Sequence, residues 1–154
     1  MSVSLVAKPC EFSTLGVSLD LPPAVSWEQA EGRRIRLLHK GQPLRAAVYV
    51  VELGNLETFS QVHQAELNRQ LARRLGGGAQ VWTGRGDLGG RPGSMLEVVG
   101  QRQGKPWKLI ACWQLHGGQA HVLEVMGPTT HAAQLQQWFT ALSRGWRWLQ
   151  PDRG

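Results

Sequence analysis

Residues 94–126 read SMLEVVGQRQGKPWKLIACWQLHGGQAHVLEVM, and this stretch decides the fold. Its alternation of apolar and polar residues is interrupted twice, by Gln103-Gly104 and by Gly117-Gly118. Two-residue turns that contain glycine are typical of β-hairpins, because these turns need positive φ angles that glycine adopts freely. We therefore predict three antiparallel strands over Ser94–Arg102, Lys105–His116 and Gln119–Met126.

The two turns also determine which side chains share a face of this sheet. If Arg102 pairs with Lys105 and His116 pairs with Gln119, one face is apolar as far as Glu124. That apolar face holds Leu96, Val98, Leu109, Ala111, Trp113, Leu115, Ala120 and Val122. The other, mixed face holds Met95, Glu97, Val99, Lys108, Ile110, Cys112, Gln114, His116, His121, Leu123 and Val125. We expect Glu97 and Lys108 to form an ion pair across the hairpin.

The remaining sequence predicts further strands and two helices. Strands are expected at Phe12–Leu21, Val25–Trp27, Arg33–Lys40, Arg45–Leu53 and Val81–Thr83, and a loop at residues 84–93 (GRGDLGGRPG). Residues 57–75 and 130–144 carry apolar residues at helical spacing. This order predicts one domain over residues 1–154, of the α+β class, with a mostly antiparallel twisted sheet of six to seven strands and two amphipathic helices. We expect the second helix to dock on the apolar face through Leu135, Trp138, Phe139 and Leu142.

Composition limits the classes of protein to which the chain can belong. Its 154 residues carry a net charge of +6, and the arginines never exceed two in a row. Such scatter is typical of a solvated surface, so we do not expect direct nucleic-acid binding. The net positive charge nevertheless leaves nucleic-acid binding as an alternative function. The N-terminus lacks the pattern of a signal peptide and no apolar run could span a membrane, so we expect a cytoplasmic protein without membrane insertion.

The chemistry-bearing residues do not form a catalytic or metal-binding pattern. Cys112, His116 and His121 share the mixed face, but alternate strand positions are separated by about 7 Å, which spreads them too far apart for one metal ion. Cys112 also lies mid-strand among apolar residues, where a thiol is inert. The glycine-rich segment 84–93 lacks the GxxxxGK[ST] phosphate-binding pattern. We expect two reduced cysteines, no metal, no cofactor and no enzymatic activity. Trp148 is the tryptophan that we expect to be free for a partner.

Three signatures resemble the PsbP/DcrB-like superfamily of small α/β sandwiches. The first is Gly16-Val17-Ser18-Leu19-Asp20-Leu21-Pro22 followed by Trp27. The second is a helix from Phe59-Ser60-Gln61 to Leu75, then a strand and Leu88-Gly89-Gly90-Arg91-Pro92-Gly93. The third is a closing amphipathic helix with an aromatic end, from Trp138-Phe139 to Trp146-Arg147-Trp148. The resemblance covers about residues 12 to 149, with the order and spacing of the motifs as its basis.

Within that superfamily the bare single domain looks most like the Eag chaperones of bacterial type VI secretion. That resemblance implies a homodimer that holds the hydrophobic N-terminal segment of an effector on an open sheet face. We expect the mixed face to serve as this surface, with a polar rim. The expected contact residues are Met95, Val99, Ile110, Cys112, Leu123 and Val125, with Gln114 and His121 as the rim. The alternative is an accessory domain whose second sheet face is closed by its own loops or N-terminal strand.

Overall fold

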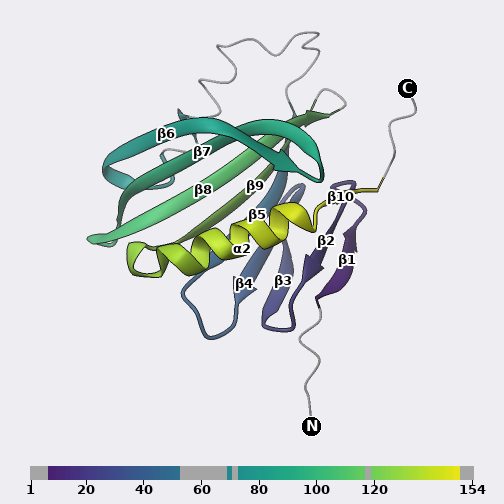
Figure 1. Ribbon diagram of the computed structural model, residues 1–154, viewed down its shortest axis with the longest axis horizontal. Helices are drawn as coiled ribbons and strands as arrows, with labels where there is room; N and C mark the ends of the chain where they lie inside the picture. The colour runs from purple at the N-terminus through teal and green to yellow at the C-terminus, as the bar shows by residue number, and fades with distance from the viewer. Residues whose placement is uncertain (1–6, 53–68, 71–72, 117–118, 150–154) are drawn as a thin grey trace.

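The computed structural model describes residues 7–52, 69–70, 73–116 and 119–149. In these ranges, seven strands form one antiparallel sheet and three shorter strands form a second sheet, with a single long helix near the C-terminus (Figure 1). None of the helices in the described part is long and apolar enough to cross a membrane.

The meander of residues 94–126 has the predicted strands and register. Strand β7 spans Arg91–Arg102, β8 spans Lys105–His116 and β9 spans Gln119–Pro128. Arg102 pairs with Lys105 and His116 pairs with Gln119, as the two turns required. At the first turn Gln103 has a φ angle of 53° and Gly104 one of 75°, which is the left-handed geometry of a tight hairpin. The predicted assignment of side chains to faces is therefore confirmed.

The predicted loop at residues 84–93 is wrong. Strand β6 runs from Gly76 to Leu88 and pairs along β7, so that the turn is confined to Gly89-Gly90. Gly93 shows why a glycine-rich segment can be a strand here, because a Cβ at this position would overlap the carbonyl of Trp113 on β8. The glycines allow close approach between strands rather than a mobile loop.

The seven-stranded sheet has the order β3-β4-β5-β9-β8-β7-β6. Its other strands are β3 (Val25–Ala30), β4 (Arg34–His39) and β5 (Arg45–Glu52). The second sheet consists of β1 (Lys8–Phe12), β2 (Val17–Leu21) and β10 (Arg147–Trp148). The predicted strand over Phe12–Leu21 is thus two strands, because Gly16 turns the chain with a φ angle of 70°.

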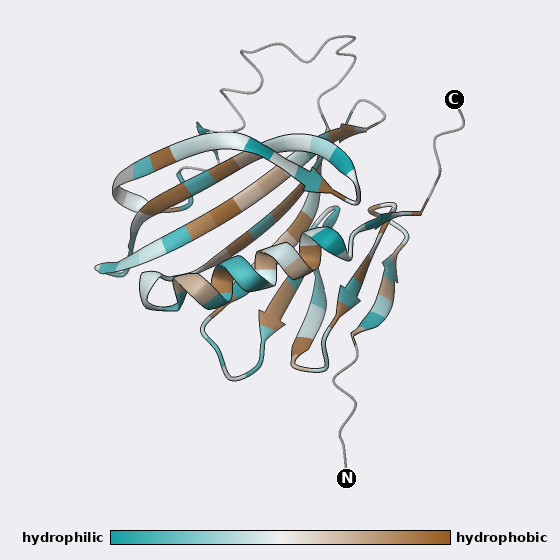
Figure 2. Ribbon diagram, in the orientation of Figure 1, coloured by the Kyte–Doolittle hydropathy of each residue, from teal (hydrophilic) through white to brown (hydrophobic). Residues whose placement is uncertain are grey.

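Helix α2 (Ala132–Arg144), preceded by the short helix η1 (Thr129–His131), packs on the mixed face. The prediction that it docks on the apolar face is wrong. The helix lies across β9 and β5, where the mixed face carries Leu123, Val125 and Val48, all without exposed surface. Hydrophobic bands on these strands meet a helix that alternates between hydrophobic and hydrophilic residues (Figure 2). We call this side of the sheet the helix face and the opposite side the groove face.

The groove face has a second apolar cluster, which contains the predicted apolar-face residues of the meander together with Leu75. Of the predicted first helix over residues 57–75, residues 57–68 and 71–72 lie outside the described residues, Arg69 and Gln70 are helical, and residues 73–75 are not helical. The described part therefore contains one of the two predicted amphipathic helices.

The C-terminal segment forms hydrogen bonds with strands of both sheets. Arg147 donates two hydrogen bonds to the Asp20 carboxylate, at 2.8 and 3.1 Å. The indole of Trp148 donates to the Leu88 carbonyl at 3.2 Å and packs edge-on against His121. Trp148 is half-buried by these contacts, so the prediction that it is free for a partner is wrong.

Candidate functional site

The helix face does not present the predicted open surface. Ile110, Cys112, Leu123 and Val125 have no exposed surface beneath α2, and His121 is 4% exposed. The remaining predicted contact residues, Met95, Val99 and Gln114, are half-buried. The chain itself closes this face, as one of the alternatives anticipated, and both helix α2 and the N-terminal strand β2 belong to the core cluster that covers it. A partner could reach the four buried side chains only if α2 left the sheet.

The groove face carries a solvent-filled groove of about 910 Å³ over β4, β5 and β9. Five arginines line it, and they come from four separate parts of the sequence. They are Arg34, Arg36, Arg45, Arg74 and Arg102. Strand pairing explains how they meet, because Arg36 pairs with Ala47, which pairs with Glu124, while Arg45 pairs with both Leu38 and Met126. We call this feature the arginine groove.

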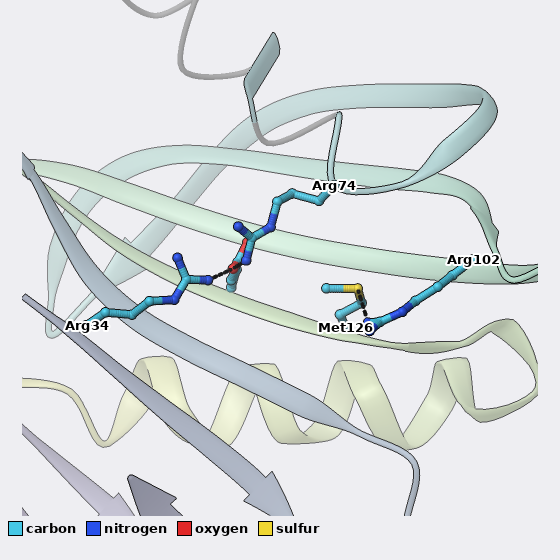
Figure 3. A network of polar contacts seen from close by, with 5 residues as sticks. Arg34, Arg74, Arg102 and Met126 are labelled. Carbon is cyan, nitrogen blue, oxygen red and sulfur yellow. Dashed lines mark hydrogen bonds and ion pairs between the residues drawn. The ribbon is translucent and has the colours of Figure 1, made fainter. Parts of the chain in front are cut away.

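A buried glutamate holds two of these arginines. Glu124 is only 2% exposed and pairs with Arg34 at 3.0 Å and with Arg74 at hydrogen-bond distance. Figure 3 shows the two guanidinium groups converging from β4 and from the segment before β6. The second carboxylate oxygen, Oε2, and the Nε of Arg34 make no hydrogen bond within the described residues, although both atoms are buried. The carboxylate is therefore only partly satisfied.

The titration behaviour of this cluster follows from its burial. Desolvation raises the pKa of the Glu124 carboxyl, and the guanidiniums of Arg74 and Arg34 oppose that rise. Desolvation likewise raises the pKa of Tyr49, whose ring lies 4.6 Å below the Arg34 guanidinium and whose hydroxyl faces the same carboxylate. The cation–π contact and the ion pair together fix the position of Arg34.

The other three arginines are held more loosely. Arg36 faces Glu28 at 3.7 Å, and more than half of each side chain is exposed, so this pair contributes little to stability. Arg102 approaches the sulfur of Met126 at 3.7 Å (Figure 3), and its guanidinium also lies 5.0 Å from the ring of Trp107. Within the described residues, neither Arg102 nor Arg45 has an ion pair with a carboxylate. Two guanidiniums are thus available to an external anion.

The groove is also partly apolar. Leu38 is 44% exposed and lies on the groove face beside Arg36, and Met126 and Ala47 form part of the floor. Glu28, Glu31 and Glu124 are its acidic residues, so five arginines against three glutamates leave a net positive charge. The arrangement suits a ligand that combines negative charge with apolar groups.

The sequence offered one usable signal for this site. Arg34 and Arg36 alternate with Ile35 and Leu37, which predicts a strand with a basic face. Placing Arg45, Arg74 and Arg102 beside that face requires the strand order β4-β5-β9-β8-β7, which local patterns do not reveal. The register of the meander predicts that Glu124 lies on the groove face, but it does not predict that the arginines lie beside Glu124.

The described part of the chain contains no group of three or more His, Cys, Asp or Glu side chains that could hold a metal ion. Burial raises the pKa of the Cys112 thiol to about 12, so the thiol is protonated and poorly nucleophilic at neutral pH. Cys112 and Cys10 are both free thiols, as predicted.

No protein-family profile and no curated protein matches this sequence. Solved structures do match the fold. PsbP (CyanoP) from the cyanobacterium Synechocystis aligns over 94% of both chains with a TM-score of 0.71 and 9% identity. The chain has a PsbP/Mog1-like α+β fold. Mog1p from Saccharomyces cerevisiae, described as a Ran-binding protein, aligns over 96% of this chain and 97% of its own, with a TM-score of 0.64 and 9% identity.

LpqN from Mycobacterium tuberculosis, described as involved in cell envelope biogenesis, shares the PsbP/Mog1-like fold. It aligns over 91% of this chain and 83% of its own, with a TM-score of 0.61 and 12% identity. The TM-scores establish a shared fold, but identities this low do not establish a shared function. The function has to be argued from the arginine groove.

Proposed function

We propose that this protein is a non-catalytic binding module and that its arginine groove takes an acidic, partly apolar segment of a protein partner. The observation that carries the proposal is the convergence of five arginines from four parts of the chain around one groove of about 910 Å³. Side chains so far apart in sequence lie together only because the sheet brings them there.

The guanidinium group explains why the partner should be acidic. Arginine binds carboxylates through two parallel hydrogen bonds, and it is less strongly hydrated than lysine. Arg45 and Arg102 have no acidic partner in the described part of the chain, so a carboxylate of the partner would supply one. Glu124 holds Arg34 and Arg74 in place, which reduces the conformational entropy lost when a ligand binds.

The lining of the groove favours a protein segment over a nucleic acid. Glu28 and Glu31 lie on one side of the groove, where they would repel a continuous phosphate backbone more than a peptide whose carboxylates are separated by apolar residues. Leu38 exposes 44% of its surface, and an apolar side chain of a peptide would cover it. No described tryptophan lines the groove as a stacking platform for bases.

This proposal includes the effector chaperone that the family resemblance implied, with a change of surface. An effector's hydrophobic N-terminal segment would fit the arginine groove if it also carried carboxylates. The accessory-domain alternative is compatible with the same groove, because closure of the helix face by α2 leaves the groove face unaffected.

A probe of defined chemistry tests the proposal. The probe is a labelled peptide of alternating glutamate and leucine, and its binding is measured by fluorescence anisotropy beside a single-stranded oligonucleotide of equal charge. We expect R45E and R102E each to weaken peptide binding roughly tenfold or more, because like charges would then oppose each other in the groove. R144E is the matched control, since Arg144 is an exposed arginine on α2.

The outcome separates the alternatives. Binding of the peptide should also weaken as salt increases, because the contacts are partly exposed. An equal loss for R144E would show that net charge and not the groove is responsible, and would refute the proposal. Tighter binding of the oligonucleotide than of the peptide would support the nucleic-acid alternative instead.

A further inference from the structure

One end of the arginine groove holds cations that have no acidic partner. Arg45 and Arg102 line this end of the groove. Lys105 pairs with Arg102 in the β7–β8 hairpin and therefore lies on the same face of the sheet. Within the described residues, none of these three side chains forms an ion pair. We call Arg45, Arg102 and Lys105 the cationic cluster.

Met126 on the floor of the groove lies between the two arginines of this cluster. Figure 3 shows Arg102 reaching from β7 to Met126, where a guanidinium nitrogen lies 3.7 Å from the sulfur. Arg45 is the direct strand partner of Met126, so their Cα atoms are about 4.5–5.5 Å apart on the same face. An arginine side chain spans that distance. Both guanidiniums can therefore contact one group that lies over Met126.

The unpaired acidic residue of the groove lies at its opposite end. Glu31 follows Ala30, which pairs with Arg34, whereas Arg45 pairs with Leu38, four residues further along β4. At about 3.3 Å per residue this separation is about 13 Å, beyond the screening length of about 8 Å at physiological salt. The other two glutamates of the groove already face arginines outside the cluster. The cationic cluster therefore keeps its positive charge.

We propose that the cationic cluster binds a phosphorylated side chain of the partner segment. This inference rests on the function proposed for the groove and specifies the ligand. A phosphorylated serine carries a charge of about −1.5 to −2 at neutral pH and presents three acceptor oxygens. The five arginines and three glutamates of the groove leave two positive charges, which one such phosphate neutralises. Clusters of arginines are the usual means by which proteins recognise phosphorylated segments.

The number of donors in the cluster favours a phosphate over a carboxylate. A single guanidinium already satisfies a carboxylate, because it donates two parallel hydrogen bonds to the two oxygens. Arg45 and Arg102 together offer twice that number, and the third oxygen of a phosphate allows it to bridge them. The ring of Trp107, 5.0 Å from the Arg102 guanidinium, holds that side chain in place before a ligand binds. Less conformational entropy is then lost on binding.

The surroundings of the cluster favour a peptide as the carrier of the phosphate. Leu38 pairs with Arg45 and is 44% exposed, so an apolar residue near the phosphorylated one would cover it. A nucleic acid would extend further phosphates toward Glu31 at the other end of the groove, where they would be repelled. A single phosphate on a partly apolar segment meets only the cationic end.

Three labelled peptides test the inference by fluorescence anisotropy. They share the alternating glutamate and leucine sequence and differ at one central residue, which is glutamate, serine or phosphoserine. We expect wild-type protein to bind the phosphoserine peptide roughly tenfold or more tightly than the glutamate peptide, because charged hydrogen bonds are added. R45Q and R102Q should each remove most of this preference. R144Q is the matched control, since Arg144 is exposed on α2, and circular dichroism establishes that each variant is folded.

Failure of this inference is distinguishable from failure of the proposed function. Equal binding of the phosphoserine and glutamate peptides overturns the phosphate site and leaves the acidic segment in place. Absence of binding by all three peptides overturns both. A preference that survives in both R45Q and R102Q, or that R144Q removes equally, overturns the assignment to the cationic cluster.

Two competitors establish the source of the phosphate. We expect inorganic phosphate to displace the phosphoserine peptide only at much higher concentrations, because it lacks the contacts of the segment with the rest of the groove. Displacement at equal concentration would assign the cluster to a free anion and overturn the inference. Tighter binding to vesicles that contain phosphatidic acid than to the phosphoserine peptide would assign it to a lipid headgroup, with the same consequence.

Discussion

The turn between β6 and β7 provides the sharpest test of the structure, because its two adjacent glycines share a left-handed backbone but differ in how closely other atoms approach them. Gly89 and Gly90 both have left-handed φ angles, of 58° and 81°. A Cβ on Gly89 would lie 2.7 Å from the carbonyl oxygen of Trp146 and 2.9 Å from its ring, whereas a Cβ on Gly90 would meet nothing within 4 Å. Alanine at either position adopts the same unfavourable conformation, but only G89A also collides with the C-terminal segment.

These contacts give the expected magnitudes. A left-handed alanine costs about 1–2 kcal/mol, and the reduced entropy of the unfolded chain returns about 0.4–1 kcal/mol, so G90A should lose roughly 1 kcal/mol of stability. G89A carries the same cost plus overpacking of about 1–3 kcal/mol, because the nearest atom belongs to the backbone and cannot rotate away. We expect G89A to be less stable than G90A by about 1–3 kcal/mol.

Urea denaturation followed by tryptophan fluorescence measures this difference. Trp146 and Trp148 lie at the site, and the seven tryptophans together report the global unfolding of the chain. The denaturant slope should be the same in both variants, which shows that their unfolded states are comparable. Equal losses of stability in G89A and G90A would refute the packing of the β6–β7 turn against the C-terminal segment.

Two further predictions concern buried ionisable groups. Burial raises the pKa of Glu124, so the folded protein binds this proton more tightly than the unfolded chain does. The stability due to this group is therefore complete below the ordinary value of 4.5 and is lost as pH rises through the raised value. We expect E124Q to remove that decline in urea-denaturation free energies as the pH rises above the ordinary value of 4.5; an identical decline in the variant would contradict this. The pKa of Cys112 is raised to about 12 by burial, so iodoacetamide should label only Cys10 in the folded protein and both cysteines in urea; mass spectrometry that finds two labels without urea would contradict this.

Local sequence signals predicted the meander because the information was contained in its turns. Gln103-Gly104 sets the register between neighbouring strands, and alternation then assigns each side chain to a face. The segment 84–93 was mistaken for a loop because its glycines resemble loop composition. Its strand character depends on pairing with β7 and on close approach to β8, which are tertiary properties.

The face on which α2 docks could not be predicted from the average character of each face. The mixed face contains Glu97, Lys108 and Gln114, but these lie outside the buried cluster that α2 forms with Ile110, Cys112, Leu123 and Val125. Glu97 and Lys108 pair at 3.8 Å, as predicted, and so satisfy each other. The apolar residues of β5, β8 and β9 that α2 covers decided the outcome, and placing them together required knowledge of the strand order.

Glu124 supports the argument that the arginine groove is a binding surface. Its pKa is raised despite two adjacent guanidiniums, so at neutral pH the ionised carboxylate costs stability relative to its protonated form. Buried ion pairs of this kind are often replaced by apolar residues without loss of stability, so stability alone does not account for the charge. Glu124 does fix the positions of the Arg34 and Arg74 guanidinium groups, because it forms an ion pair with each of them. The loss of stability caused by the ionised Glu124 is expected if Arg34 and Arg74 have to be fixed in position to contact a ligand.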